Sequence, residues 1–120
     1  MIKNNENKEQ AKAYISQLMM IFKNYQQKSP ELLDIIDVLE QVYKRLDDAK
    51  KPEILVNRLV NYIRSNSLKG KIYYPTKEEK IIINLAFIGQ KAGFNIQYNA
   101  DFSDKSQFYH FNEVIPYHNR

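Results

Sequence analysis

Residues 76–93 are the most apolar segment of the chain, and their pattern predicts a helix with hydrophobic side chains on two sides. At about 100° per residue, Ile81 and Leu85 share the face that would join a hydrophobic core. Ile83 and Phe87, four residues apart, point to a different side. A surface helix needs only one apolar face. We therefore expect a further element to cover Ile83 and Phe87, either the aromatic C-terminal tail of the same chain or a partner protein.

Three amphipathic segments precede this helix, each marked by hydrophobic residues at helical spacing. Start signals separate them, because Ser29 followed by Pro30 opens the second helix and Pro52 opens the third. Thr76 and Glu79 have the spacing of a capping box at the start of the fourth. The predicted helices cover about residues 8–26, 30–48, 52–69 and 76–92.

Four helices joined by short connections are expected to form an all-α, antiparallel, up-down four-helix bundle, with residues 1–120 as a single domain. After Gly93, which can end the last helix, residues 94–101 alternate between apolar and polar side chains in the manner of a strand. A lone strand has no partner in such a fold. We therefore interpret residues 94–120 as an extended aromatic tail that packs on helices 3 and 4.

Composition and motifs give no support for catalysis. The chain has no cysteine, so it cannot form a disulfide or a thiolate zinc site. His110 and His118 lie in the tail without the neighbouring carboxylate pattern of a metal site. The sequence contains neither a Gly-rich phosphate loop nor a dinucleotide fingerprint. We expect a protein that is not an enzyme and that uses no cofactor and no metal.

The longest apolar stretch, residues 81–89, is about half of the ~20 residues that a transmembrane helix requires. We therefore expect a soluble, cytoplasmic protein without a transmembrane segment. The formal net charge is +4, and residues 52–75 contain four basic residues against Glu53 alone. A mild basic bias of this kind favours contact with nucleic acid or with the inner face of a membrane. An ordinary solvated helix surface explains it equally well.

A row of basic and aromatic residues runs along the third helix and the connector after it. Such a row can grip phosphates or an acidic partner, and an exposed helix surface is the alternative. Tyr73 and Tyr74 could likewise anchor a partner or pack over the end of the bundle. The members of this basic–aromatic face are Arg58, Tyr62, Arg64, Lys69, Lys71, Tyr73 and Tyr74.

Short motifs follow one another in an order typical of one protein family. The third helix contains Leu59-Val60-Asn61-Tyr62-Ile63-Arg64, and Ile88-Gly89 lies near the end of the fourth. Asp104-Lys105-Ser106-Gln107-Phe108 follows shortly afterwards. Over residues 8–111 the chain resembles the bacteriocin immunity proteins of the enterocin A immunity type. It differs from them in its longer C-terminal end, residues 112–120, and in its Ile/Phe-rich fourth helix.

The resemblance implies a protein that performs no chemistry and protects a lactic acid bacterium that produces a pediocin-like bacteriocin. Members of this family act inside the cell, where they recognise the membrane part of the mannose phosphotransferase permease once a bacteriocin has engaged it. They block the lethal permeabilised state. Specificity within the family is attributed mainly to the C-terminal half.

The C-terminal half, to which the family's specificity is attributed, contains the fourth helix with its uncovered apolar side. We expect the tail to cover Ile83 and Phe87, and this helix–tail unit of a monomeric protein to recognise the receptor complex. Binding energy in such a surface is concentrated in a few aromatic residues. The expected recognition residues are Ile83, Phe87, Phe102, Asp104, Lys105, Gln107, Phe108 and Tyr109.

Two other classes of function stay open at this point. A small basic nucleic-acid-binding or regulatory domain would use Arg58, Arg64, Lys69 and Lys71, and salt-sensitive retention on DNA would support it. The acidic second helix has no obvious place on a duplex and argues against nucleic acid as a partner. A structural module that dimerises through the fourth helix would instead show a mass that depends on concentration.

Overall fold

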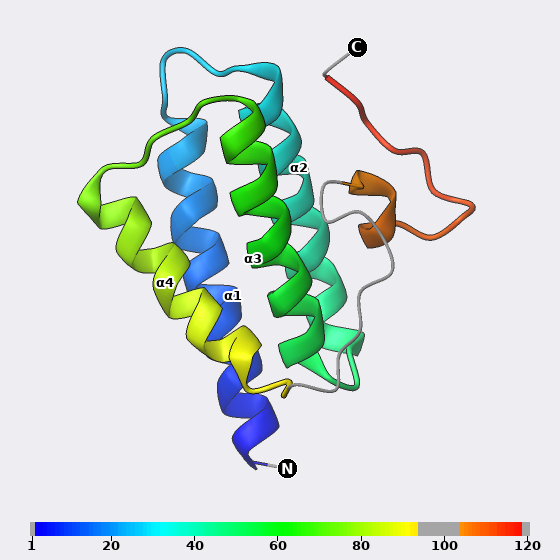
Figure 1. The fold of residues 1–120 in the computed structure, drawn as a ribbon. Coiled ribbons are helices and arrows are strands. Elements are labelled where there is room, and N and C mark those ends of the chain that lie inside the picture. The colour runs from blue at the N-terminus through cyan, green and yellow to red at the C-terminus, as the bar shows by residue number, and fades with distance from the viewer. Residues whose placement is uncertain (1, 94–103, 119–120) are drawn as a thin grey trace.

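A computed structural model describes the backbone of residues 2–93 and 104–118, and the side chains of these ranges from Glu6 onward. Within these residues the chain is helical and contains no strand. Four α-helices form a bundle (Figure 1), which confirms the predicted all-α four-helix fold. The elements are α1 (Ile2–Lys23), α2 (Pro30–Arg45), the 3-10 helix η1 (Leu46–Asp48), α3 (Pro52–Lys69), α4 (Thr76–Gln90) and the 3-10 helix η2 (Lys105–Phe108).

The helix boundaries follow the start signals closely. α3 begins at Pro52 and ends at Lys69, as predicted. α2 begins at Pro30, where Ser29 Oγ accepts a hydrogen bond from Leu32 N at 3.1 Å, so the predicted cap is confirmed. α1 covers residues 2–23 instead of 8–26, and the last turn expected for α2 is the tighter helix η1. In Figure 1 each connection joins neighbouring helices at one end of the bundle, so consecutive helices run in opposite directions.

The predicted capping box of α4 is wrong. Pro75 occupies the cap position, and its carbonyl accepts the backbone N–H of Glu79 at 3.0 Å, so Thr76 is already the first helical residue. The Glu79 carboxylate instead binds the guanidinium of Arg64 on α3. The chain leaves α4 earlier than predicted, and Gly93 then has a φ of 92°, a conformation that glycine adopts without strain.

The core lies between the four helices, and α3 packs extensively against α4. Gly89 explains the close approach, because a Cβ at this position would lie 2.8 Å from the Cα of Asn57 on α3. Two carbon atoms cannot approach to this distance in a packed interior, so any side chain at residue 89 would push the helices apart. The Ile88-Gly89 motif thus has a packing role: Ile88 is buried in the core, and Gly89 lets the two backbones meet.

α4 buries one apolar side and leaves the other in solvent. Ile81 and Leu85 are buried in the core, as predicted. Ile83 and Phe87 remain 41% and 58% exposed. Residues 104–118 of the tail pack on α2 and α3 and do not cover this pair (Figure 1). The predicted placement of the tail on helices 3 and 4 is therefore wrong for this part, because its strongest polar and apolar contacts lie on α2 and α3.

The strand-like stretch 94–101 and Phe102 lie outside the described residues. Among the helices that are described, none combines the length and the apolarity that crossing a bilayer demands.

Candidate functional site

A buried ion-pair cluster around Lys105, the first residue of η2, holds the tail on the bundle. Lys105 Nζ lies 2.9 Å from Asp34 Oδ1 and 3.0 Å from Asp37 Oδ2, both on α2, and it also donates to the carbonyl of Pro116. Lys105 and Asp34 are both buried. Burying a charge is costly unless it is paired and hydrogen-bonded, and here one ammonium group serves three oxygen atoms. The cluster explains why the tail lies against α2.

Phe108 supplies the apolar half of the attachment. Its side chain is fully buried and meets the ring of Tyr62 on α3 edge-to-face, with centroids 5.4 Å apart and an interplanar angle of 82°. Arg45 Nη1 on α2 donates to the Phe108 carbonyl at 3.1 Å. Burial raises the pKa of the Tyr62 hydroxyl above its ordinary value. Phe108 thus closes over Tyr62 and extends the hydrophobic core outward from the bundle.

The other polar residues of the motif at residues 104–108 shape the turn itself. Asp104 Oδ1 accepts from Ser106 N at 2.9 Å and from Ser106 Oγ at 2.6 Å, which caps the start of η2. Gln107 Nε2 donates to the Asp104 carbonyl at 2.7 Å. The motif therefore has a structural role: its local hydrogen bonds fix the turn, and Lys105 and Phe108 attach the turn to the bundle.

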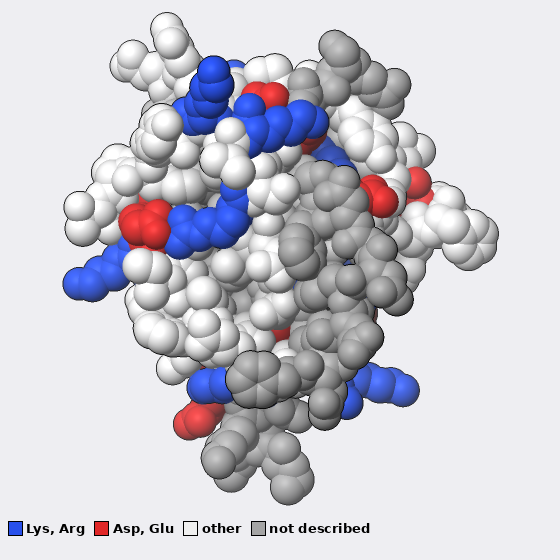
Figure 2. All heavy atoms as spheres, viewed as in Figure 1, with Lys and Arg blue, Asp and Glu red and all other residues white. Residues whose placement is uncertain are grey.

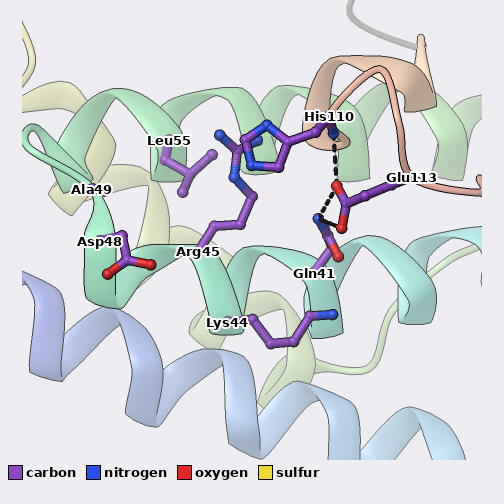
Figure 3. Close-up of a pocket in the computed structure, with 8 residues that line it drawn as sticks. All are labelled: Gln41, Lys44, Arg45, Asp48, Ala49, Leu55, His110 and Glu113. Atoms are coloured by element: carbon purple, nitrogen blue, oxygen red, sulfur yellow. Dashed lines mark hydrogen bonds between the residues drawn. The ribbon is translucent and has the colours of Figure 1, made fainter.

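Beyond η2 the tail returns to α2 and borders an open hollow of about 410 Å³ (Figure 3). Glu113 Oε1 accepts from the backbone N–H of His110 at 2.6 Å and from Gln41 Nε2 at 3.1 Å. These donors, the His110 N–H foremost, hold the pKa of Glu113 below its ordinary value. The lining combines charges of both signs: Gln41, Lys44, Arg45, Asp48, Ala49, Leu55, His110 and Glu113.

The Glu113 contacts predict a titration in the tail. A carboxyl whose pKa is lowered by folding contributes stability above its ordinary pKa of 4.5, and this contribution is lost as the pH falls through the lowered pKa. We expect the NMR shift of the His110 amide proton to titrate with a midpoint below 4.5. Gln41→Ala removes the second donor and should raise this midpoint. A wild-type midpoint at or above 4.5 would show that the contact does not form in solution.

Asp34, Asp37 and His118 have side chains that bind metals, and their donor atoms lie within 4.8 Å of one another. The Lys105 ammonium already contacts one oxygen of each carboxylate, and His118 Nε2 lies 2.7 Å from Asp37 Oδ2. A divalent ion would have to displace a buried, hydrogen-bonded ammonium group. Within the described part of the chain, this cluster therefore favours lysine as its cation over a metal.

The predicted basic–aromatic face does not form one surface. Tyr62 is buried beneath Phe108, so its predicted exposure is wrong, because the docked tail gives α3 a second buried side. Arg64 is bound to Glu79 by two hydrogen bonds of 2.8 and 2.6 Å. Tyr74 is partly buried and stacks on an aromatic ring of α1. These three residues are thus engaged within the protein.

Among the other members of this face, Lys69, Lys71 and Tyr73 are exposed and Arg58 is half-buried, and Arg64 is also exposed although it is paired with Glu79. Figure 2 shows Lys and Arg side chains spread over the visible face of the molecule, with Asp and Glu side chains between them. A protein that tracks a phosphate backbone needs a more continuous positive surface. On the face shown, the described side chains therefore count against the nucleic-acid alternative.

The α2 side of the tail attachment was not predicted from the sequence. Asp34, Asp37, Gln41 and Arg45 all bind the tail through the contacts above. They recur at intervals of three or four residues and thus share one side of the helix. This stripe of polar residues on α2, with charges of both signs, was the sequence signal that could have indicated a second packing partner for the helix.

The expected recognition residues fall into two groups. Ile83 and Phe87 are exposed on α4, as is Asp104 in the tail, and Gln107 and Tyr109 are partly buried. Lys105 and Phe108 are buried and cannot contact a partner while the tail is docked. Their role in this structure is to position the tail. The described tail and α4, which carries Ile83 and Phe87, lie on different sides of α3 (Figure 1), so the described residues do not unite them in one surface.

Comparison with known proteins gives consistent matches. Residues 2–90 match the model of the bacteriocin immunity protein family. The chain is 54% identical over 101 residues to a probable mesentericin-Y105 immunity protein of Leuconostoc mesenteroides, which covers 84% of this chain and 88% of that protein. It is 50% identical over 109 residues to a probable leucocin-A immunity protein of Leuconostoc gelidum, which covers 91% of this chain and 96% of that protein. No solved structure matches the chain.

Proposed function

The chain belongs to the bacteriocin immunity protein family, as its motifs predicted, and from this premise we propose that it protects a cell against a bacteriocin similar to mesentericin Y105 or leucocin A. The support for this toxin class is the identity of 54% and 50% with the two Leuconostoc relatives, each over most of the chain. Family membership also supports a protein that acts by binding and not by catalysis.

In this proposal the protein acts from the cytoplasmic side of the membrane. It binds the receptor of the bacteriocin, the mannose phosphotransferase permease, once the toxin has engaged it, and it blocks the lethal permeabilised state. The resemblance carried by the three sequence motifs supports this mechanism. No step requires a cofactor or a metal, since protection follows from occupancy of the receptor complex.

Ile83 and Phe87 carry the proposed contact with the receptor. They form an exposed aliphatic–aromatic pair on an ordered helix, at 41% and 58% exposure. Aromatic anchors of this kind often supply most of the energy of an interface. Apolar surface in water costs about 25 cal/mol per Å², so a partner that covered the pair would recover this energy. The docked tail, with Tyr109 partly exposed, is the proposed source of specificity between toxins.

Expression of the chain in a sensitive strain tests both parts of the proposal. We expect survival against mesentericin Y105 or leucocin A, and loss of survival in the Ile83→Ser/Phe87→Ser variant. Met20→Ser removes an exposed apolar side chain of α1 and should keep full protection. Circular dichroism should show that both variants are folded. A wild-type chain that protects against neither toxin would contradict the toxin class, and protection by the double variant would contradict the contact surface.

A further inference from the structure

The last turn of α3 and the loop that follows it expose two large apolar side chains on an ordered backbone. Leu68 is 82% exposed and Tyr73 is 90% exposed. The loop backbone is held by hydrogen bonds, with Ile72 N donating to Ser67 O at 2.8 Å and Lys71 N donating to Leu68 O at 3.2 Å. The fold therefore keeps two apolar groups in water at a fixed place, where burial would be favourable.

The two adjacent tyrosines of this loop have opposite environments. Tyr74 stacks on Phe22 of α1 with ring centroids 5.5 Å apart, and its hydroxyl is hydrogen-bonded to that of Ser67. Tyr74 therefore packs over the end of the bundle, and only Tyr73 is free to serve as an anchor. Leu68 and Tyr73 line one open hollow of about 420 Å³ with Ser67, Lys71 and Ile72, so they belong to the same patch.

Basic side chains surround this patch. Lys69 and Lys71 are exposed, and Lys28, from the connection between α1 and α2, lines a neighbouring hollow together with Gly70. The side chain of Glu31 lies against Gly70, and Glu79, which is paired with Arg64, lines a further hollow with Leu68 and Tyr73. The three lysines and Arg64 thus outnumber the two carboxylates beside this patch. The two connections meet at the same end of the bundle in Figure 1, and basic side chains lie at this end in Figure 2.

Lys71 has a backbone conformation that lysine rarely adopts. Its φ is 55°, in the left-handed region where glycine is favoured and most side chains cost free energy. The preceding Gly70 has a φ of −88°, and it is instead required by the close approach of Glu31, whose Cβ would lie 2.8 Å from a Cβ at residue 70. Strained positions often belong to functional surfaces, which agrees with a lysine that is retained for binding.

We propose that this end of the bundle docks on the surface of a bilayer that contains anionic lipid. Leu68 and Tyr73 enter the interfacial layer, where tyrosine is favoured and an aliphatic side chain leaves water. Lys28, Lys69 and Lys71 stay at the level of the anionic headgroups. The charge of the patch complements such a surface. This inference goes beyond the immunity function and does not depend on it, because the contact needs neither toxin nor receptor.

Sedimentation of the purified full-length chain with vesicles tests the proposal. We expect binding to vesicles of phosphatidylglycerol and phosphatidylcholine, little binding to phosphatidylcholine alone, and a decrease with added salt. The variant Leu68→Ser/Tyr73→Ser should lose this binding. Lys71→Gly should weaken it about fivefold, the contribution of one lysine near an anionic surface. It should not lower the melting temperature, because glycine suits the backbone at this position.

Two matched controls separate this patch from general effects of the substitutions. Phe111→Ser removes an exposed aromatic ring of the tail, and Lys50→Gly removes an exposed lysine at the opposite end of the bundle. Both should bind vesicles like the wild type. Equal binding to neutral vesicles, no binding to either, or a similar loss in the controls would overturn the proposal. So would lost protection by Leu68→Ser/Tyr73→Ser with unchanged vesicle binding, which would assign the patch to a protein partner.

Discussion

Replacing Lys105 by Met should destabilise the docked tail by about 3–5 kcal/mol, the usual effect of removing one partner from a buried ion pair. Asp34 would then remain buried beside Asp37 without the ammonium group that offsets their two negative charges. The tail should detach so that both carboxylates regain water, while the four helices stay folded around their own core. Limited proteolysis should reveal the change, because the rate of cleavage within residues 105–118 should rise by about 100-fold or more.

Two further variants make this result specific to the buried cluster. Lys23→Met removes an ion pair of similar length, 2.7 Å to Glu40, in which both side chains are about half-exposed, and it should change stability by about 1 kcal/mol or less. Lys105→Met/Asp34→Asn removes the stranded charge together with the ammonium, and it should restore part of the protection against proteolysis. A Lys105→Met variant that is cleaved as slowly as the wild type would show that the cluster does not hold the tail.

The helices were predictable from the sequence because their signals are local. Proline at the first helical position marks the start of α2 and α3, and hydrophobic residues at helical spacing identify the buried sides. The prediction of a capping box was also wrong for a local reason. Thr76 and Glu79 fit the pattern, but Pro75 takes the cap position one residue earlier. Spacing alone does not show which residue of a short stretch first leaves helical geometry.

The tail site was less predictable because its partners are far apart in the chain. Lys105 and Asp34 are separated by 71 positions, and no periodicity connects an ammonium group with a carboxylate over that distance. The sequence singled out the motif at residues 104–108, but its Lys and Phe were expected at a partner surface and are instead buried against α2 and α3. The role of a motif that folds back on its own chain is visible only in three dimensions.

Tyr62 illustrates the same limit on α3. Its neighbours Leu59 and Ile63 belong to the buried side of the helix, whereas Tyr62 aligns with the polar residues Arg58 and Ser65. A single packing partner would have left the ring at the surface. The tail provides a second partner, because Phe108 covers the ring, and it turns a boundary position into a buried one.

Phe108→Ala is expected to lower the free energy of unfolding by about 3 kcal/mol, because it deletes a fully buried ring and leaves a cavity beside Tyr62. Urea denaturation followed by circular dichroism measures this loss. If the docked tail sets the specificity of immunity, as proposed, the same variant should also lose protection of sensitive cells at equal expression. Lys105 cannot compensate, because an ion pair does not fill the space of an aromatic ring.

The matched control for this variant is Phe111→Ala, which removes the same side chain three residues further along, where the ring is fully exposed. It should leave both stability and protection unchanged, since no buried apolar surface is lost. A Phe108→Ala chain that is destabilised yet fully protective would contradict the role of the docked tail in specificity and leave Ile83 and Phe87 on α4 as the recognition surface. A Phe108→Ala chain with wild-type stability and wild-type protection would refute the docked tail itself as a functional element.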